Sequence, residues 1–181
     1  MGLNKAVFLD RDGVINKAII RDRKPYAPST FDEFEIIHGV KKAVSSLKKT
    51  GYLIVVVTNQ PDVGNGYVDK KIVEKMNKEM LNDLQIDAVK VCFHKQTDGC
   101  ECRKPKPGML LEAAQEYDIN LTSSYMIGDR KSDIEAGIAA GCKTVFIDNN
   151  YILSEQPITK DLVACSLLDS ISKLKSVGDY E

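Results

Sequence analysis

The sequence contains no apolar run long enough to cross a lipid bilayer. Its longest clean run, residues 53–57, is far shorter than the roughly 20 residues that a membrane-spanning helix needs. The N-terminus also lacks the apolar core of a secretion signal, because charged residues return by Asp10. These absences predict a cytoplasmic protein without a membrane partner.

The chain also lacks an excess of charge of either sign. It has 25 Lys and Arg against 26 Asp and Glu, a net charge of -1, whereas nucleic-acid-binding surfaces are strongly basic. We therefore expect no nucleic-acid partner. No repeat, low-complexity tract or linker divides the 181 residues, and 43% of them are hydrophobic, which is enough for a buried core. We predict one domain over residues 1–181, acting as a monomer.

Disulfides are rare in the cytoplasm, so the five cysteines need another explanation. Cys92, His94, Cys100 and Cys102 fall in one short segment. Three thiolates and one imidazole form a complete tetrahedral ligand set for Zn²⁺, with no position left open for catalysis. We predict a structural zinc loop over residues 92–104. The alternative is a group of reduced thiols beside a surface histidine.

Short apolar runs alternate with stretches of helical apolar spacing along the whole chain. The predicted strands are 6–9, 52–57, 88–93, 124–127 and 145–147, and the predicted helices are 40–49, 69–84, 107–117, 132–140 and 166–175. This alternation predicts a doubly wound parallel sheet covered by helices on both faces, a three-layer α/β/α fold. The proline-containing residues 13–34 are expected to form a flap or hairpin over the end of the first strand.

Polar side chains follow several of these strands directly. Asp10 and Asp12 follow the first, Thr58 follows the second, and Asp129 follows the fourth. In parallel α/β sheets, ligands bind at the carboxyl ends of the strands. A turn stabilised by an Asx hydrogen bond would explain Asp12 alone. The cysteine loop follows the third strand, and this coincidence at four strand ends instead favours a functional site.

The chemistry that these residues support is phosphoryl transfer. Asp10, Asp12 and Asp129 offer the hard oxygen ligands that suit Mg²⁺. One carboxylate can attack phosphorus to form an aspartyl-phosphate. A second can protonate the leaving oxygen and later activate water. Mg²⁺, Arg103 and Lys104 would offset the charge of the transferred group. The alternative for the two basic residues is a solvated charge pair.

Four segments resemble the ordered motifs of the haloacid-dehalogenase-like phosphohydrolases. They are Phe8-Leu-Asp-Arg-Asp-Gly-Val-Ile15, Thr58-Asn-Gln60, Lys104 and Gly128-Asp-Arg-Lys-Ser-Asp133. The resemblance implies a Rossmann-like fold, with Asp10 as nucleophile and Asp12 as general acid and base. It implies that Thr58 and Lys104 hold the phosphoryl group.

The same resemblance implies how Mg²⁺ is held. The Asp10 carboxylate, the Asp12 backbone carbonyl and Asp129 would be its ligands, with Asp133 supporting the metal from behind.

The zinc loop, followed by Cys102-Arg-Lys-Pro105, is similar to that of the heptose-bisphosphate and histidinol-phosphate phosphatases. Both are small members without a large cap domain. Residues 103–109 resemble the heptose branch, which removes the 7-phosphate of D-glycero-D-manno-heptose 1,7-bisphosphate during synthesis of nucleotide-activated heptose for surface polysaccharide. The resemblance implies that Arg103 and Arg130 recognise the substrate, and Arg21 could contact its second phosphate. The predicted substrate-binding residues are Arg11, Arg21, Asn59, Gln60, Arg103 and Arg130.

Two departures from the heptose pattern keep histidinol phosphate, and other small sugar or nucleotide phosphates, as alternative substrates. Only five residues separate His94 from Cys100, as in the histidinol type, and Pro61-Asp62 stands where heptose enzymes more often have Ser-Gly. A histidinol amine would need an acid such as Asp22 or Asp62. A binding module without activity is a further alternative, which the intact Asp10 and Asp12 oppose, and the charge balance opposes a zinc ribbon for nucleic acid.

Overall fold

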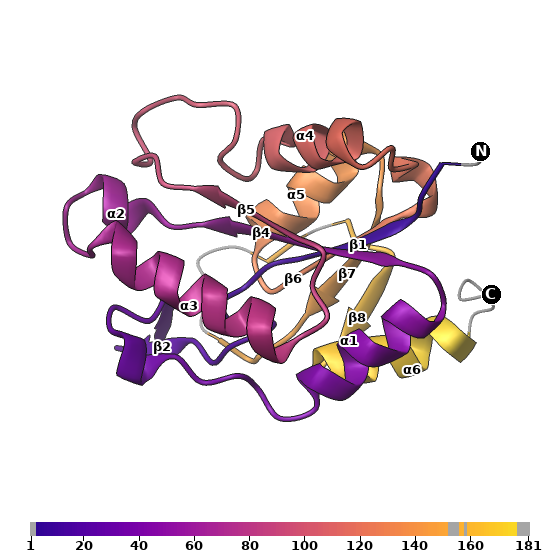
Figure 1. The fold of residues 1–181 in the computed structure, drawn as a ribbon, viewed down its shortest axis with the longest axis horizontal. Coiled ribbons are helices and arrows are strands. Elements are labelled where there is room, and N and C mark those ends of the chain that lie inside the picture. Colours follow the sequence, from indigo (N-terminus) through magenta and orange to yellow (C-terminus); the bar gives the residue numbers. More distant parts are fainter. Residues whose placement is uncertain (1–2, 152–155, 158, 177–181) are drawn as a thin grey trace.

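The computed structural model describes residues 3–151, 156–157 and 159–176, and its centre is a six-stranded parallel sheet (Figure 1). The strand order is β5-β4-β1-β6-β7-β8. The strands are β1 (Ala6–Leu9), β4 (Leu53–Asn59), β5 (Ala88–Cys92), β6 (Tyr125–Gly128), β7 (Lys143–Ile147) and β8 (Leu162–Ala164). This arrangement confirms the predicted fold class.

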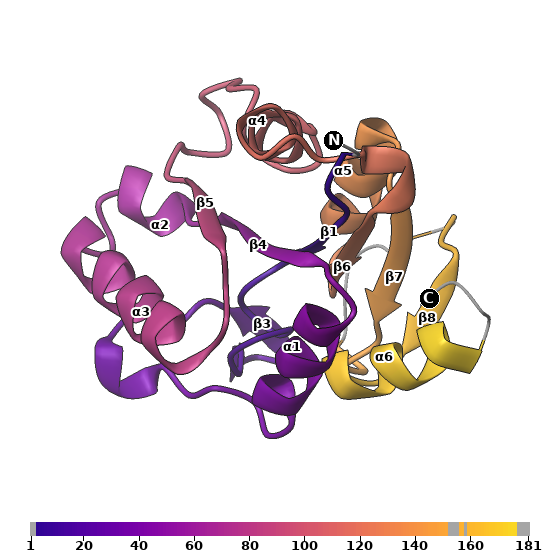
Figure 2. The ribbon, with the colours of Figure 1, turned by 45° about the vertical axis from the view of Figure 1, so that its right-hand side comes forward.

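Helices cover both faces of the sheet. They are α1 (Val40–Lys49), α2 (Pro61–Gly64), α3 (Lys70–Asp83), α4 (Gly108–Glu116), α5 (Lys131–Ala140) and α6 (Leu167–Ser176), with 3-10 turns η1 (Phe31–Glu33) and η2 (Leu121–Ser123). Figure 2 shows α4 and α5 on one side of the strands and α1 and α6 on the other. Within the described part of the chain, no helix has the length and apolarity to span a bilayer.

The two faces of β1 explain the two layers of packing. All four of its residues are buried, and successive side chains point to opposite faces of a strand. Val7 and Leu9 belong to the core under α1 and α6, while Ala6 and Phe8 belong to the core under α4 and α5. A strand buried on both faces is apolar throughout, which is why this run stands out in the sequence.

The predicted elements did not include β8 or α2, nor the short turns η1 and η2. The edge strand β8 is only three residues long and pairs with β7 from Val145↔Leu162 to Ile147↔Ala164. The one-turn helix α2 begins at Pro61, whose fixed φ suits a first helical turn. The strand predicted to end at residue 57 also continues through Asn59, so Thr58 and Asn59 lie in β4 itself.

The segment predicted to be a flap contains a β-hairpin, formed by β2 (Ile19–Arg21) and β3 (Lys24–Tyr26). Asp22 and Arg23 have φ values of 50° and 62°, the left-handed conformation that a tight hairpin turn needs. Arg130 Nη2 donates to the Pro25 carbonyl oxygen at 2.8 Å, which ties the hairpin to the end of β6.

Candidate active site

The predicted site residues meet where β4, β1 and β6 end, because these three strands are neighbours in the sheet. A cavity of about 300 Å³ opens at this edge. Seven of the expected residues line it: Asp10, Asp12, Asn59, Arg103, Lys104, Arg130 and Asp133. The hairpin contributes Pro25 and Tyr26 to the same cavity.

Lys104 is a buried cation that lines the cavity. It is 2% exposed, and its Nζ lies 2.7 Å from Asp10 Oδ1, from Asp133 Oδ1 and from the Val57 carbonyl oxygen. Burial alone would lower the pKa of Lys104, but the attraction of Asp10 and Asp133 outweighs it and the pKa is raised. The lysine therefore carries a permanent positive charge beside the Asp10 carboxylate.

Asp10, Asp129 and Asp133 bring carboxylate oxygens within 4.8 Å of one another, and all three residues are buried. Burial raises the pKa of Asp10 to about 6, against the opposing charge of Lys104. Burial, together with the charges of Asp10 and Asp133, also raises the pKa of Asp129 well above its ordinary value. Asp129 Oδ1 is buried without a hydrogen-bond donor. Such a cluster fits a divalent cation such as Mg²⁺.

Gly13 makes room for Asp129. Its φ is +91°, and a Cβ placed there would lie 2.0 Å from Asp129 Oδ2. Asn149 Nδ2 donates to the Gly13 carbonyl oxygen at 3.0 Å and to Asp129 Oδ2 at 3.3 Å. Sequence reasoning missed Asn149. The available signal was its place directly after β7, at the same edge of the sheet.

The Asp12 carboxylate is held apart from this cluster by its own set of donors. Its Oδ1 accepts from Arg11 Nη2 and from Asn16 Nδ2, each at 3.0 Å. Its Oδ2 accepts from Gln60 Nε2 at 2.7 Å, and the same nitrogen lies 2.9 Å from Thr58 Oγ1. Gln60 and Thr58 are buried behind Asp12 and are not lining residues of the cavity.

The four expected arginines divide into two pairs. Arg103 and Arg130 line the cavity, and Arg103 Nη1 is buried without a hydrogen-bond acceptor, as a group awaiting an anion would be. Arg11 and Arg21 do not line it. Arg11 is fully buried beside Asp12, whereas Arg21 is exposed and lies 3.7 Å from Glu33.

Asn59 fixes the loop that carries Lys104. Its Nδ2 donates to the Lys104 carbonyl oxygen at 3.0 Å, and its Oδ1 accepts from the Lys104 backbone N–H at 3.1 Å. This reciprocal pair joins the end of β4 to the loop before α4. Asn59 therefore holds the Lys104 backbone and also lines the cavity.

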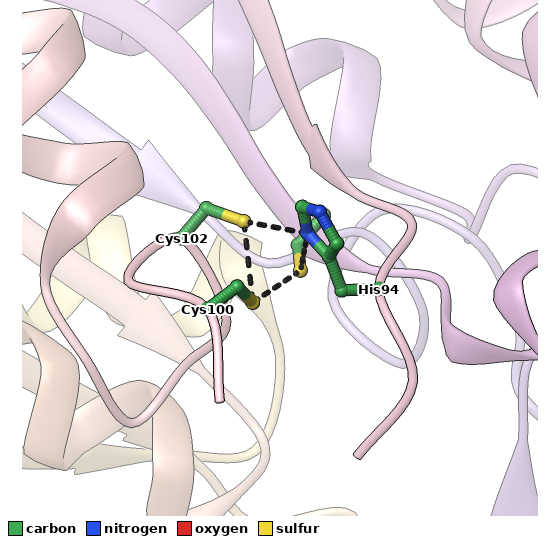
Figure 3. Close-up of side chains that lie close together, drawn as sticks. His94, Cys100 and Cys102 are labelled. Carbon is green, nitrogen blue, oxygen red and sulfur yellow. Dashed lines mark hydrogen bonds between the residues drawn. The ribbon is translucent and has the colours of Figure 1, made fainter. Parts of the chain in front are cut away.

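The cysteine loop gathers the four predicted zinc ligands (Figure 3). Cys92 Sγ and Cys100 Sγ are 3.7 Å apart, Cys100 Sγ and Cys102 Sγ 3.5 Å, and His94 Nδ1 lies 3.2 Å from Cys102 Sγ. Tetrahedral zinc with bonds of about 2.3 Å to sulfur would separate two sulfurs by about 3.8 Å. The spacing therefore fits a shared metal, and all four residues belong to the part of the chain described here.

Comparison with known proteins places the chain in a family. A family model described as HAD-hydrolase-like matches residues 101–170. A D-glycero-beta-D-manno-heptose-1,7-bisphosphate 7-phosphatase of Helicobacter pylori is 37% identical over 164 residues, covering 87% of this chain and 88% of the relative. A D-glycero-alpha-D-manno-heptose-1,7-bisphosphate 7-phosphatase of Campylobacter jejuni is 39% identical over 150 residues, covering 80% and 83%.

A solved structure agrees with these relatives. The D,D-heptose 1,7-bisphosphate phosphatase of B. bronchiseptica, complexed with magnesium and phosphate, has a TM-score of 0.83 at 27% identity, covering 96% of this chain and 99% of that one. The shared sheet, the identity over most of both lengths and the family-model match lead to one conclusion. The chain belongs to the haloacid-dehalogenase-like phosphatases, in the group of the heptose-1,7-bisphosphate 7-phosphatases.

Proposed function

We propose that this protein is a Mg²⁺-dependent phosphatase that removes the 7-phosphate of D-glycero-D-manno-heptose 1,7-bisphosphate through an aspartyl-phosphate. One observation carries the mechanism: Asp10 borders the cavity with the Lys104 ammonium 2.7 Å from its carboxylate and with Asp12 two residues further on. A nucleophile, a cation and a second carboxylate thus border one cavity. The names of the relatives supply the substrate.

In the first step, a carboxylate oxygen of Asp10 attacks phosphorus and the bond from phosphorus to the sugar oxygen breaks. Asp12, in its protonated form, gives its proton to that departing oxygen, so the sugar leaves as an alcohol. Lys104 lies against the nucleophile and offsets the charge of the transferred group. Arg103 Nη1, which has no acceptor of its own, is available to a phosphate oxygen.

In the second step, the now ionised Asp12 accepts a proton from water as that water attacks phosphorus. The acyl-phosphate bond breaks, inorganic phosphate leaves, and Asp10 and Asp12 return to their starting forms. Asp10, Asp129 and the Asp12 backbone carbonyl would hold Mg²⁺, with Asp133 supporting them. The bound metal supplies further positive charge to the phosphoryl oxygens.

The Cys92, His94, Cys100 and Cys102 cluster would hold a structural Zn²⁺. Arg103 and Lys104 follow Cys102 directly, so a metal there fixes the loop that carries both cations. The proposed enzyme is a cytoplasmic monomer acting on a small phosphorylated sugar.

Histidinol phosphate is the second candidate substrate, and one observation favours it. Asp62 lines the cavity, where its carboxylate would suit a substrate amine. Side-by-side kcat/KM values for the two substrates decide between them. We expect the heptose bisphosphate to be preferred. A clear preference for histidinol phosphate would contradict this assignment.

The enzymatic proposal is tested by Asp10→Asn, which removes the nucleophile and keeps the shape of the side chain. We expect turnover to be abolished while the circular dichroism spectrum of the folded protein is retained. If the parent protein hydrolyses no phosphomonoester in the presence of Mg²⁺, the enzymatic proposal is wrong and the alternative of a binding module stands.

A further inference from the structure

Arg11 is a buried charge between the two catalytic aspartates in the sequence. Its side chain is 0% exposed, so it makes no contact with solvent or with the cavity. Its Nε and Nη2 donate to Asp12 Oδ1 at 3.2 and 3.0 Å. Its remaining nitrogen, Nη1, donates to Asn77 Oδ1 at 3.0 Å. Every nitrogen of the guanidinium therefore has an acceptor. Two of the nitrogens donate to Asp12, and the third donates to Asn77.

Asn77 comes from α3, 66 residues further along the chain. It is 8% exposed and lies on the same helix face as the buried Val73, Met76 and Met80. A polar side chain on an apolar helix face is costly unless it is hydrogen-bonded. The bond to Arg11 gives Asn77 the partner that its position requires. Through this bond, α3 contacts the residue that binds the Asp12 carboxylate.

Arg11 is also the charged member of the donor set around Asp12. The other donors to that carboxylate are the neutral amides of Asn16 and Gln60. A guanidinium fixes a carboxylate in direction as well as in charge, because its planar N–H groups must meet the oxygens in line. The Phe34 ring, 5.9 Å from the guanidinium carbon, packs against the same group. The orientation of Asp12 thus depends on where Arg11 is anchored.

We propose that Asn77 is a positioning residue for the reaction: by holding Arg11 Nη1 it orients the Asp12 carboxylate toward the leaving oxygen. This role rests on the proposed function, in which Asp12 is the general acid and base. Arg11 was expected to bind the substrate. In this proposal it holds the Asp12 carboxylate instead.

Two variants of Asn77 separate its acceptor from its bulk. Asn77→Leu keeps the size and removes the acceptor, whereas Asn77→Asp keeps an oxygen at the same place. We expect Asn77→Leu to lower kcat by about tenfold or more, because a general acid works only within hydrogen-bond reach of its target. KM for the heptose bisphosphate should change less than twofold. Asn77→Asp should stay within about threefold of the parent kcat.

The matched control is Val73→Ala, a truncation on the same buried face of α3 that offers no hydrogen bond to Arg11. It should lower the melting temperature and leave kcat near the parent value. A second readout compares kcat/KM for the sugar phosphate and for p-nitrophenyl phosphate, whose leaving group departs without a proton. Asn77→Leu should lose more on the sugar phosphate, while a general loss of folded protein would lower both equally.

Two results overturn the inference: parent-like kcat in Asn77→Leu, or equal losses of kcat/KM on the two esters. These outcomes differ from a failure of the proposed function. That failure would appear as a parent without phosphatase activity, or as an Asp12→Asn variant that retains it.

Discussion

At the scale of single residues, the carboxylate cluster of the site has more negative charge than the cations in contact with it. Asp10, Asp129 and Asp133 are buried together, and the ammonium of Lys104 lies between two of them. Arg130 adds a weaker contact, with its Nε 3.7 Å from Asp129 Oδ1. Buried carboxylates in excess of their cations are unfavourable unless a further cation binds. The raised pKa values of Asp10 and Asp129 express the same imbalance.

Gly13→Ala should damage this cluster without removing any ligand. The added methyl carbon would occupy the place of Asp129 Oδ2, 2.0 Å away, so the carboxylate must move. We expect the Mg²⁺ concentration for half-maximal activity to rise by about tenfold or more, as a misplaced ligand predicts.

Gly51→Ala is the control for Gly13→Ala. Gly51 has a φ of +80° with nothing within 4 Å of an added Cβ, so it shares the backbone strain and lacks the clash. Its Mg²⁺ dependence should match the parent. Equal behaviour of the two variants would contradict the idea that Gly13 makes room for Asp129.

The sequence predicts the residues at the strand ends well, and the residues behind them poorly. Asp10, Asp12 and Asp129 follow apolar runs, so their place is visible in the pattern. Asn77 interrupts an apolar helix face. A single polar residue there forms no sequence pattern from which its distant partner could be predicted. The same limit explains Arg11, whose burial depends on contacts far along the chain.

At the scale of elements, the loop from β5 to α4 joins the cysteine cluster to the cavity. Cys92 ends β5, and Gln96 and Arg103 from the same loop line the cavity. The Asn59 pair holds this loop at Lys104, and a metal at the cysteine cluster would restrain the part before it. The loop was predictable because four possible zinc ligands, three cysteines and one histidine, fall within one short segment.

Cys100→Ser should therefore reduce both zinc content and activity. We expect zinc to fall from about one ion per chain to well below one, since a lost thiolate weakens the closed ligand set. kcat/KM should fall by about tenfold or more, because Arg103 and Lys104 lose their fixed positions. Metal analysis and steady-state kinetics on the same preparation measure both quantities.

Cys165→Ser provides the comparison for Cys100→Ser, because Cys165 is an exposed cysteine outside the cluster. It should keep the zinc content and activity of the parent. Full activity in a zinc-free Cys100→Ser protein would contradict the proposal that zinc in this loop supports catalysis.

At the scale of the whole molecule, the strand order creates the site. The chain runs outward from β1 to β4 and β5, and then returns to the other side of β1 with β6. The carboxyl end of β1 thus lies at the point where the order reverses, the position at which open α/β sheets bind ligands. The alternation of strands and helices predicts a parallel sheet but does not give this order, and β8 is too short to show any periodicity.

The raised pKa values also predict how pH affects the stability of the metal-free protein. The pKa of Asp10 is about 6 in the fold against an ordinary 3.8, and that of Asp129 is raised in the same direction. Between these values the folded protein binds more protons than the unfolded chain, so its stability falls as pH rises through this window. The zinc-loaded, Mg²⁺-free protein should then show a greater pH-dependent loss in melting temperature from pH 5.5 to 7.5 than Asp129→Asn.

Mg²⁺ should reverse this loss, because it binds the ionised carboxylates that protons would otherwise neutralise. At about 100 times its dissociation constant it would add about 2.7 kcal/mol to the free energy of unfolding, a rise of about 5–10 °C for a chain of this size. The rise should be larger at pH 7.5 than at pH 5.5, where protons compete for Asp10 and Asp129. In Asp129→Asn it should largely disappear at both pH values. Thermal melts at fixed zinc content measure all four conditions, and an equal Mg²⁺ effect at the two pH values in the parent would show that these carboxylates are not the ones that bind the metal.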